Sequence, residues 1–130
     1  MSVQLELDTN VVEAGDELSG VVQLGLAPEK RAKAKAVTVR LFAVVHGAGN
    51  TEEAPGDEVR IPVEPGSGDR FRFTLKSPKD GPVTYRGPFI KIDWVVRAEV
   101  DLPWDLDPNT QKGVGLLPRR RSRDAAVTRG

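Results

Sequence analysis

Residues 89–101 read FIKIDWVVRAEVD, and apolar and charged side chains alternate along most of this stretch. Successive side chains of a strand point to opposite faces of the sheet, so the pattern predicts a long strand with one buried face and one wet face. Only Phe89 and Val95 interrupt the wet face. The apolar residues expected on the buried face are Ile90, Ile92, Trp94, Val96, Ala98 and Val100. A shift of one residue would bury the charged side chains, so the register is firmly fixed.

Similar alternation predicts further strands over residues 3–7, 18–26, 36–46, 59–63 and 71–75. Gly20 lies on an inward face, which indicates a bulge or a close backbone approach. Pro62 cannot donate to a sheet ladder, so its strand is expected to lie at an edge or to carry a bulge. Regular turns and the lack of a convincing helical period predict an all-β fold, an antiparallel β-sandwich of the immunoglobulin-like or arrestin-like type.

The connections between these strands are predicted from their composition. Residues 28–35 form a polar, basic connection whose length favours a loop, with a helical turn from its Ala-Lys repetition as the alternative. Residues 47–56 are small and acidic and are expected to form a loop, while residues 77–88, rich in Pro and Gly, form a linker. Lys112–Pro118 is expected either to add a last strand or to pack as a strap.

Charge divides the chain into two parts, although the formal net charge of the 130 residues is zero. Residues 1–107 hold 18 acidic and 13 basic side chains, whereas residues 108–130 hold one acid and six bases. This asymmetry predicts a sandwich domain over residues 1–107 and a basic, flexible tail over residues 108–130. There is no cysteine, so disulfides and thiolate metal sites are excluded. With no secretory leader and no apolar run of membrane-spanning length in the sequence, we expect a cytoplasmic protein.

Three segments together resemble arrestin-like domains. Residues 13–24, EAGDELSGVVQL, are similar to the family's opening turn and Gly-containing strand. Ala36–Val45 is similar to its Val-rich strand, and Tyr85-Arg86-Gly87 with the strand ending VRAEVDLPW is similar to a later signature. The likeness is to bacterial sporulation-control proteins and α-arrestin domains. It implies a single arrestin N-type domain, in a bacterial setting, that binds proteins through loops and strand edges without catalysis.

The sequence also departs from that family. Ala14 stands where proline is usual, although Gly15 keeps the turn. Full arrestins have two tandem sandwiches, and this chain has room for one. Gln4–Glu6 occupies the region of the phosphate-sensing lysine pair of metazoan arrestins, so that function is not carried over.

Catalytic and metal-binding candidates are few. His46 is the sole histidine, no nucleophile motif accompanies it, and a solvated histidine at a strand end is expected. We therefore predict no enzyme, no catalytic residue and no cofactor. Asp101, Asp105 and Asp107, with Asn109, supply oxygen ligands of the kind that Ca²⁺ takes, and a solvated acidic loop is the alternative.

Candidate partner contacts come from the outer face of one strand, one loop and the tail. Phe42 and Val44 are apolar on the outward parity of residues 36–46, so they are expected to be covered or to face a partner. Trp104 is either an interface anchor or packs over the end of the sandwich. The basic run of the tail consists of Arg119, Arg120, Arg121 and Arg123.

Two functional hypotheses follow. The first is a protein-binding or scaffolding module that recognises a protein partner through strand edges and loops, with homo-oligomers formed through edge strands as a further option. The alternative is an anion-tethered protein whose Arg-rich tail makes nonspecific contact with nucleic acid, anionic lipid or an acidic protein. The simpler interpretation of the tail is that its charge only keeps the protein soluble.

Overall fold

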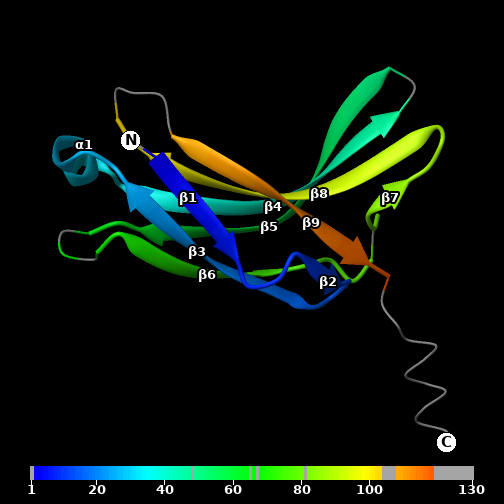
Figure 1. Cartoon of the computed structure of the whole chain (residues 1–130), viewed down its shortest axis with the longest axis horizontal. Helices are drawn as coiled ribbons and strands as arrows, with labels where there is room; N and C mark the ends of the chain where they lie inside the picture. Colours follow the sequence, from blue (N-terminus) through cyan, green and yellow to red (C-terminus); the bar gives the residue numbers. More distant parts are fainter. Residues whose placement is uncertain are drawn as a thin grey trace, which may run out of the picture.

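The computed structural model describes residues 2–47, 49–64, 66, 68–80, 82–103 and 108–118, which form two stacked sheets (Figure 1). The smaller sheet has the order β1-β3-β6, and the larger one has the order β2-β9-β8-β4-β5, with β7 also paired to β8. The elements are β1 (Ser2–Leu7), β2 (Val11–Glu13), β3 (Glu17–Gly25), α1 (Pro28–Lys33), β4 (Ala36–Gly47), β5 (Asn50–Pro62), β6 (Arg70–Lys76), β7 (Tyr85–Arg86), β8 (Ile90–Asp101) and β9 (Asn109–Leu117). Pairing is antiparallel except between β2 and β9. The predicted β-sandwich is confirmed.

The core lies between the two sheets and is built from the inward-facing apolar residues. On the smaller sheet, Leu18, Val22 and Leu75 are fully buried, and on the larger sheet Val37, Val39 and Val96 are fully buried. The alternating burial of β6, exposed at Arg70 and buried at Phe71, continues to Lys76 as the sequence pattern predicts. Burial of these side chains, at about 1.5–3 kcal/mol each, is the main contribution to stability.

Trp94 is the largest of the fully buried side chains of this core. Its side chain is 2 % exposed, and its indole Nε1 donates a hydrogen bond to the carbonyl oxygen of Pro82 at 3.0 Å. The polar atom of the largest core residue is therefore paired, which removes the penalty for burying it. The predicted core position of Trp94 is confirmed.

The loop expected over residues 28–35 is wrong for its first part, which forms the short helix α1. Pro28 stands at the start of the helix, where its missing N–H needs no partner. Glu29 lies in the first turn and Lys33 in the last, which suits the helix dipole. The helical turn, which was the alternative for this segment, is what the structure has.

The loop expected over residues 47–56 is also wrong, because β5 begins at Asn50 and pairs with β4 directly after a tight turn. Gly49 has φ +84°, a left-handed conformation that glycine adopts without strain. A bulge between Arg40 and Phe42 shifts the register of the pair. Backbone hydrogen bonds to β4 thus hold the first residues of β5 in the sheet. The side chains of this polar stretch lack the alternation of a half-buried strand. Of the two alternatives expected from Pro62, an edge strand or a bulge, β5 shows both, since it ends the sheet order and its pairing with β4 is bulged.

The last described segment is a strand, which was one of the two alternatives for Lys112–Pro118. β9 pairs with β8 from Trp94↔Val114 to Glu99↔Asn109, and Val114 and Leu116 are buried. The six-stranded sheet therefore includes residues beyond Asp107, where the charge pattern changes sign. The charge of the sequence changes after Asp107, but a change of charge does not indicate whether the residues that follow hydrogen-bond to the sheet.

Gly20 lies where β3 passes close to β1 and β6. A Cβ at this position would collide with the carbonyl oxygen of Glu6 and would lie 2.8 Å from Cζ of Phe73. The close backbone approach expected from the sequence is therefore present. Within the described part of the chain, no helix is long and apolar enough to cross a membrane.

We predict that Trp94→Ala lowers the free energy of unfolding by roughly 3–5 kcal/mol, because a large aromatic side chain leaves a cavity in the core. The control is Asp93→Ala, one residue away on the opposite face, whose ion pairs with Arg86 and Lys91 are partly solvated. It should change stability by about 1 kcal/mol or less. Chemical denaturation measures both, and equal losses would contradict the two-faced placement of β8.

We also predict that Gly20→Ala destabilises the sandwich by about 1–3 kcal/mol, because the methyl group meets backbone and a packed ring. Gly113→Ala on β9 is the matched control, since the nearest atom to its Cβ is the carbonyl oxygen of Trp94 at 4.0 Å. The control should stay within about 0.5 kcal/mol of the native protein. Thermal and denaturant unfolding distinguish the two variants, and similar values would refute the close approach at Gly20.

Candidate functional site

The six-stranded sheet extends beyond the three-stranded sheet at one end. Figure 1 shows the β4–β5 hairpin and the β7–β8 hairpin projecting side by side at the right of the molecule. The β4–β8 pairing continues there through Val45↔Ile92 to Gly47↔Ile90, and Tyr85 of β7 lies opposite Ile92. We call the described residues of 46–51 and 85–91 the hairpin end.

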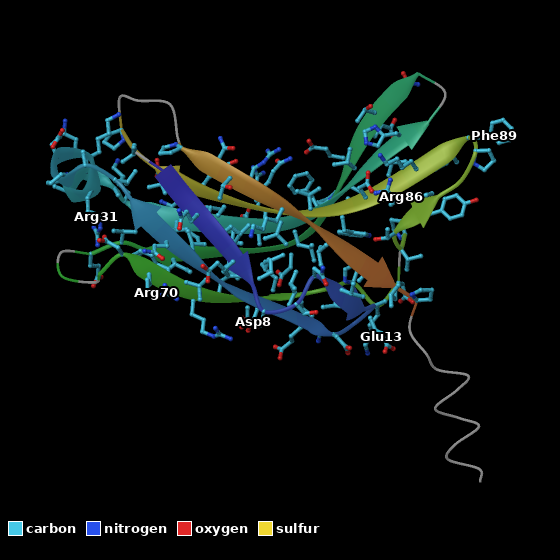
Figure 2. The ribbon with its side chains drawn as sticks, in the orientation of Figure 1. Asp8, Glu13, Arg31, Arg70, Arg86 and Phe89 are labelled. Atoms are coloured by element: carbon cyan, nitrogen blue, oxygen red, sulfur yellow. The ribbon has the colours of Figure 1, made fainter. Side chains whose placement is uncertain are left out.

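Apolar side chains gather on the hairpin end without being covered. Phe89 is 85 % exposed, Tyr85 is 51 % exposed and Ile90 is 47 % exposed. Figure 2 shows Phe89 at the tip of the β7–β8 hairpin, with its ring directed away from the sandwich. Among the described residues the other large exposed hydrophobic side chains are Val11 and Leu117, which lie in β2 and β9. Grouped exposure of this kind marks an interaction site more often than single exposed residues do.

The turn that presents Phe89 is held by its own backbone. The N–H of Gly87 donates to the carbonyl oxygen of Ile90 at 2.9 Å, which closes the hairpin between β7 and β8. A Cβ at position 87 would collide with the ring of Tyr85, so glycine is required for that ring to lie over the turn. Pro88 fixes one more backbone angle. The apolar residues are therefore presented by an ordered element.

An open hollow of about 440 Å³ lies between the two hairpin tips. Its lining residues are His46, Gly47, Gly49, Asn50, Thr51, Gly87, Pro88, Phe89, Ile90 and Lys91. Phe89 and Ile90 supply apolar surface to the hollow. Gly47, Gly49 and Gly87 have no side chain, so the hollow is open to the backbone at these positions. The hollow therefore combines apolar contact area with accessible backbone.

Two cations share one carboxylate beside the hollow. Arg86 Nη2 lies 3.2 Å from Asp93 Oδ1, and Lys91 Nζ lies 3.5 Å from Asp93 Oδ2. Glu52 and Glu53 of β5, opposite Val45 and Val44, add two exposed negative charges on the neighbouring hairpin. Lys91 is the residue of this group that also lines the hollow.

The outward residues Phe42 and Val44 lie on the outer face of β4 and not at the hollow. Phe42 is 7 % exposed, and the guanidinium carbon of Arg97 lies 4.9 Å from the centre of its ring. This cation–π contact covers the ring. Phe42 was expected either to be covered or to face a partner, and in the structure it is covered. Val44 is half-buried and lies between Asp93 of β8 and Glu53 of β5.

The other sequence-based candidates are only partly described. Trp104, the tail arginines Arg119, Arg120, Arg121 and Arg123, and the loop residues Asp105 and Asp107 lie outside the described residues. Asp101 pairs with Arg60, with Nη2 and Oδ2 3.2 Å apart. His46 is exposed, and its Nδ1 lies 3.3 Å from the hydroxyl of Thr51. In the described ranges no three side chains of metal-ligating type come together.

The exposure of Tyr85, Phe89 and Ile90 was not predicted from the sequence. The parity of the long strand placed Ile90 on the buried face, and this is wrong because the smaller sheet does not cover that end of the larger one. Two signals were present. Phe89 breaks the alternation of the strand, and Gly87-Pro88 marks a turn directly before it.

Known proteins resemble this chain in structure but not in recognisable sequence. No protein-family model matches, and no curated protein matches. The crystal structure of Spo0M, a sporulation control protein from Bacillus subtilis, superposes with a TM-score of 0.70 at 20 % identity, over 99 % of this chain and 55 % of Spo0M. The fold is arrestin-like.

Superoxide reductase (neelaredoxin) from Ignicoccus hospitalis is a weaker neighbour. It superposes with a TM-score of 0.51 at 18 % identity, over 89 % of this chain and 80 % of the reductase. At these identities both likenesses describe the fold alone. The present chain spans about half the length of Spo0M.

Proposed function

We propose that this chain is a non-catalytic protein-binding module that contacts its partner through the hairpin end. The observation that carries the proposal is the grouping of Phe89, Tyr85 and Ile90, exposed on one ordered hairpin. A few residues, Trp, Tyr and Arg above all, carry most of the binding energy at protein interfaces. Monomeric soluble proteins rarely expose large contiguous apolar patches. A rigid hairpin also loses little entropy when a partner binds.

Loop docking suits this sheet better than strand addition at the β5 edge. Pro55 and Pro62 interrupt the donors of β5. Its exposed acidic side chains are Glu52, Glu53 and Glu58. Prolines and charges of one sign are devices by which edge strands avoid pairing with other chains. We therefore assign recognition to the hairpin tips.

Other features are in keeping with a binding role. His46 is exposed and hydrogen-bonded to a threonine hydroxyl, an arrangement that suits a solvated histidine rather than a catalytic pair. The similarly folded Spo0M is named as a control protein, which fits a regulatory or scaffold role for this chain. As part of the same proposal we place the module in the cytoplasm, where a fold that uses no disulfide loses no stabilisation.

We predict that replacing Phe89 and Ile90 together by serine reduces partner capture by about tenfold or more, because it removes the apolar contact area. Both side chains are exposed, so the melting temperature should stay close to that of the native protein. Val11→Ser is the matched control, with a side chain 45 % exposed on β2. Affinity capture from cells of the source organism, quantified by mass spectrometry, measures the effect. Undiminished capture by the double variant would refute the role of the hairpin end.

The charge asymmetry of the sequence favours a second candidate, a tail that tethers the protein to an anionic surface. Residues 108–130 carry six bases and one acid, and four of the bases fall within residues 119–123. Such a run supplies charge but little shape, so it gives affinity with low specificity. We therefore assign specificity to the sandwich.

Truncation after Pro118 separates the two candidates. If the hairpin end carries binding, partner affinity and thermal stability should remain almost unchanged. A tether would instead lose affinity on truncation, and the intact protein's affinity would fall steeply with salt. Binding measured across a salt series for both forms decides between them. Capture by the isolated tail peptide, with none by the truncated protein, would reverse our assignment.

A further inference from the structure

The two hairpins of the hairpin end carry opposite excess charge. On the β7–β8 hairpin, Arg86 and Lys91 share the one carboxylate of Asp93, and their side chains remain 69 % and 45 % exposed. The β4–β5 hairpin carries the exposed Glu52 and Glu53 near its tip. One tip is therefore basic by one charge and the other is acidic by two. Both signs lie side by side on one face of the molecule.

The surface formed by the two tips is open and shallow, with one protruding side chain. Phe89 is 85 % exposed, and its ring points away from the sandwich (Figure 2). Between the tips the surface includes the backbone of Gly47 and Gly49, and a Cβ at Gly49 would meet no atom within 4 Å. Small ligands bind in sites that enclose most of their surface. A shallow face with a protruding ring is suited to another protein surface instead.

We infer that the partner of the hairpin end is a second copy of this chain, held in a twofold dimer. In a twofold interface each contact is made twice, so a face with one acidic and one basic tip complements itself. The axis passes between the tips, at right angles to the strands and to the line that joins the tips. The β4–β5 tip of each copy then meets the β7–β8 tip of the other. This inference rests on the proposed function, because it names the partner at the same site.

Two sets of contacts hold the dimer together. Arg86 and Lys91 of one copy lie against Glu52 and Glu53 of the other, so the excess charges of the tips are balanced across the interface. Phe89 of each copy packs on the open surface between the tips of the other. Because the axis repeats every contact, a small patch on one copy contributes twice to the interface.

Charge distinguishes this arrangement from its competitors. An axis along the line that joins the tips would set the acidic tip of one copy against the acidic tip of the other, and like charges repel. A partner of a single charge sign, whether a peptide or a lipid surface, would meet attraction at one tip and repulsion at the other. A second copy in the proposed arrangement meets attraction at both tips.

Sedimentation velocity of the full chain over a concentration series measures the dimer directly. The expected change is from a mass of 14.1 kDa to twice that mass. Interfaces at the small end of the size range give transient complexes. We therefore expect a dissociation constant on the order of 10–100 µM.

Charge reversal on each tip tests the arrangement of the two copies. One variant carries Glu52→Lys with Glu53→Lys, and the other carries Arg86→Glu with Lys91→Glu. Each alone should dimerise at least about tenfold more weakly than the native chain, because tips of like charge then meet. An equimolar mixture should regain dimers, since both tips of one variant are basic and both tips of the other are acidic.

Two further variants separate apolar contact from charge. Phe89→Ser should weaken dimerisation by about tenfold or more at every salt concentration. The effects of charge reversal should instead diminish with added salt. The control reverses two exposed charges at the other end of the sandwich, Lys33→Glu with Lys35→Glu at α1, and should dimerise like the native chain. Thermal melting verifies that each variant folds, and reversal at Glu52 and Glu53 leaves the ion pairs of Asp93 intact.

The outcomes distinguish this inference from the proposed function. A native chain that stays monomeric up to about 1 mM would overturn the second copy as the partner. Dimers that survive Phe89→Ser, or that charge reversal at Glu52 and Glu53 does not weaken, would also overturn it, because the copies would then meet elsewhere. In each case, partner capture that is lost when Phe89 and Ile90 are replaced would leave the proposed function standing. No dimer together with undiminished capture would overturn both.

Discussion

The antiparallel pairing of β4 with β8 is the interaction on which the rest of this structure depends. It runs without a break from Ala36↔Asp101 to Gly47↔Ile90. Along its first part the paired residues are core residues, such as Val39 opposite Ala98 and Ala43 opposite Trp94. Past Trp94 the same ladder continues into the hairpin end. The core therefore stabilises the ladder, and the ladder fixes where the two hairpin tips lie.

The hairpin end shows how a sandwich can place apolar residues in water without losing order. Phe89 and Tyr85 gain little from burial, so the stability of the β7–β8 hairpin must come from backbone hydrogen bonds and the ladder beneath it. Gly87 allows the tight turn, and Arg86 and Lys91 converge on Asp93 across the hairpin. Exposed apolar area and an ion-paired cluster are thus held together on an element whose position is set by the core.

Much of the fold can be predicted from the sequence, because alternation reports directly which side chains face the core. Residues 71–75 alternate between buried and exposed, and residues 94–100 between buried and half-buried, in the order that their pattern predicts. Parity does not report how far the opposite sheet reaches, so Ile90 was assigned to the core and is exposed. In the same way, β5 is held by pairing with β4 through Asn50–Glu53, where the side chains carry no strand pattern.

Residue-resolved amide hydrogen exchange of the full chain tests most directly whether the ladder holds the hairpin end. Our account predicts that protection continues past Trp94, so that Ile90–Asp93 and His46–Gly47 exchange at least about a hundredfold more slowly than an unstructured chain. Protection should decrease toward the tips but remain measurable at the Gly87 amide, which donates to Ile90. Protection that ends at Trp94, with the residues beyond it exchanging at unstructured rates, would contradict the account.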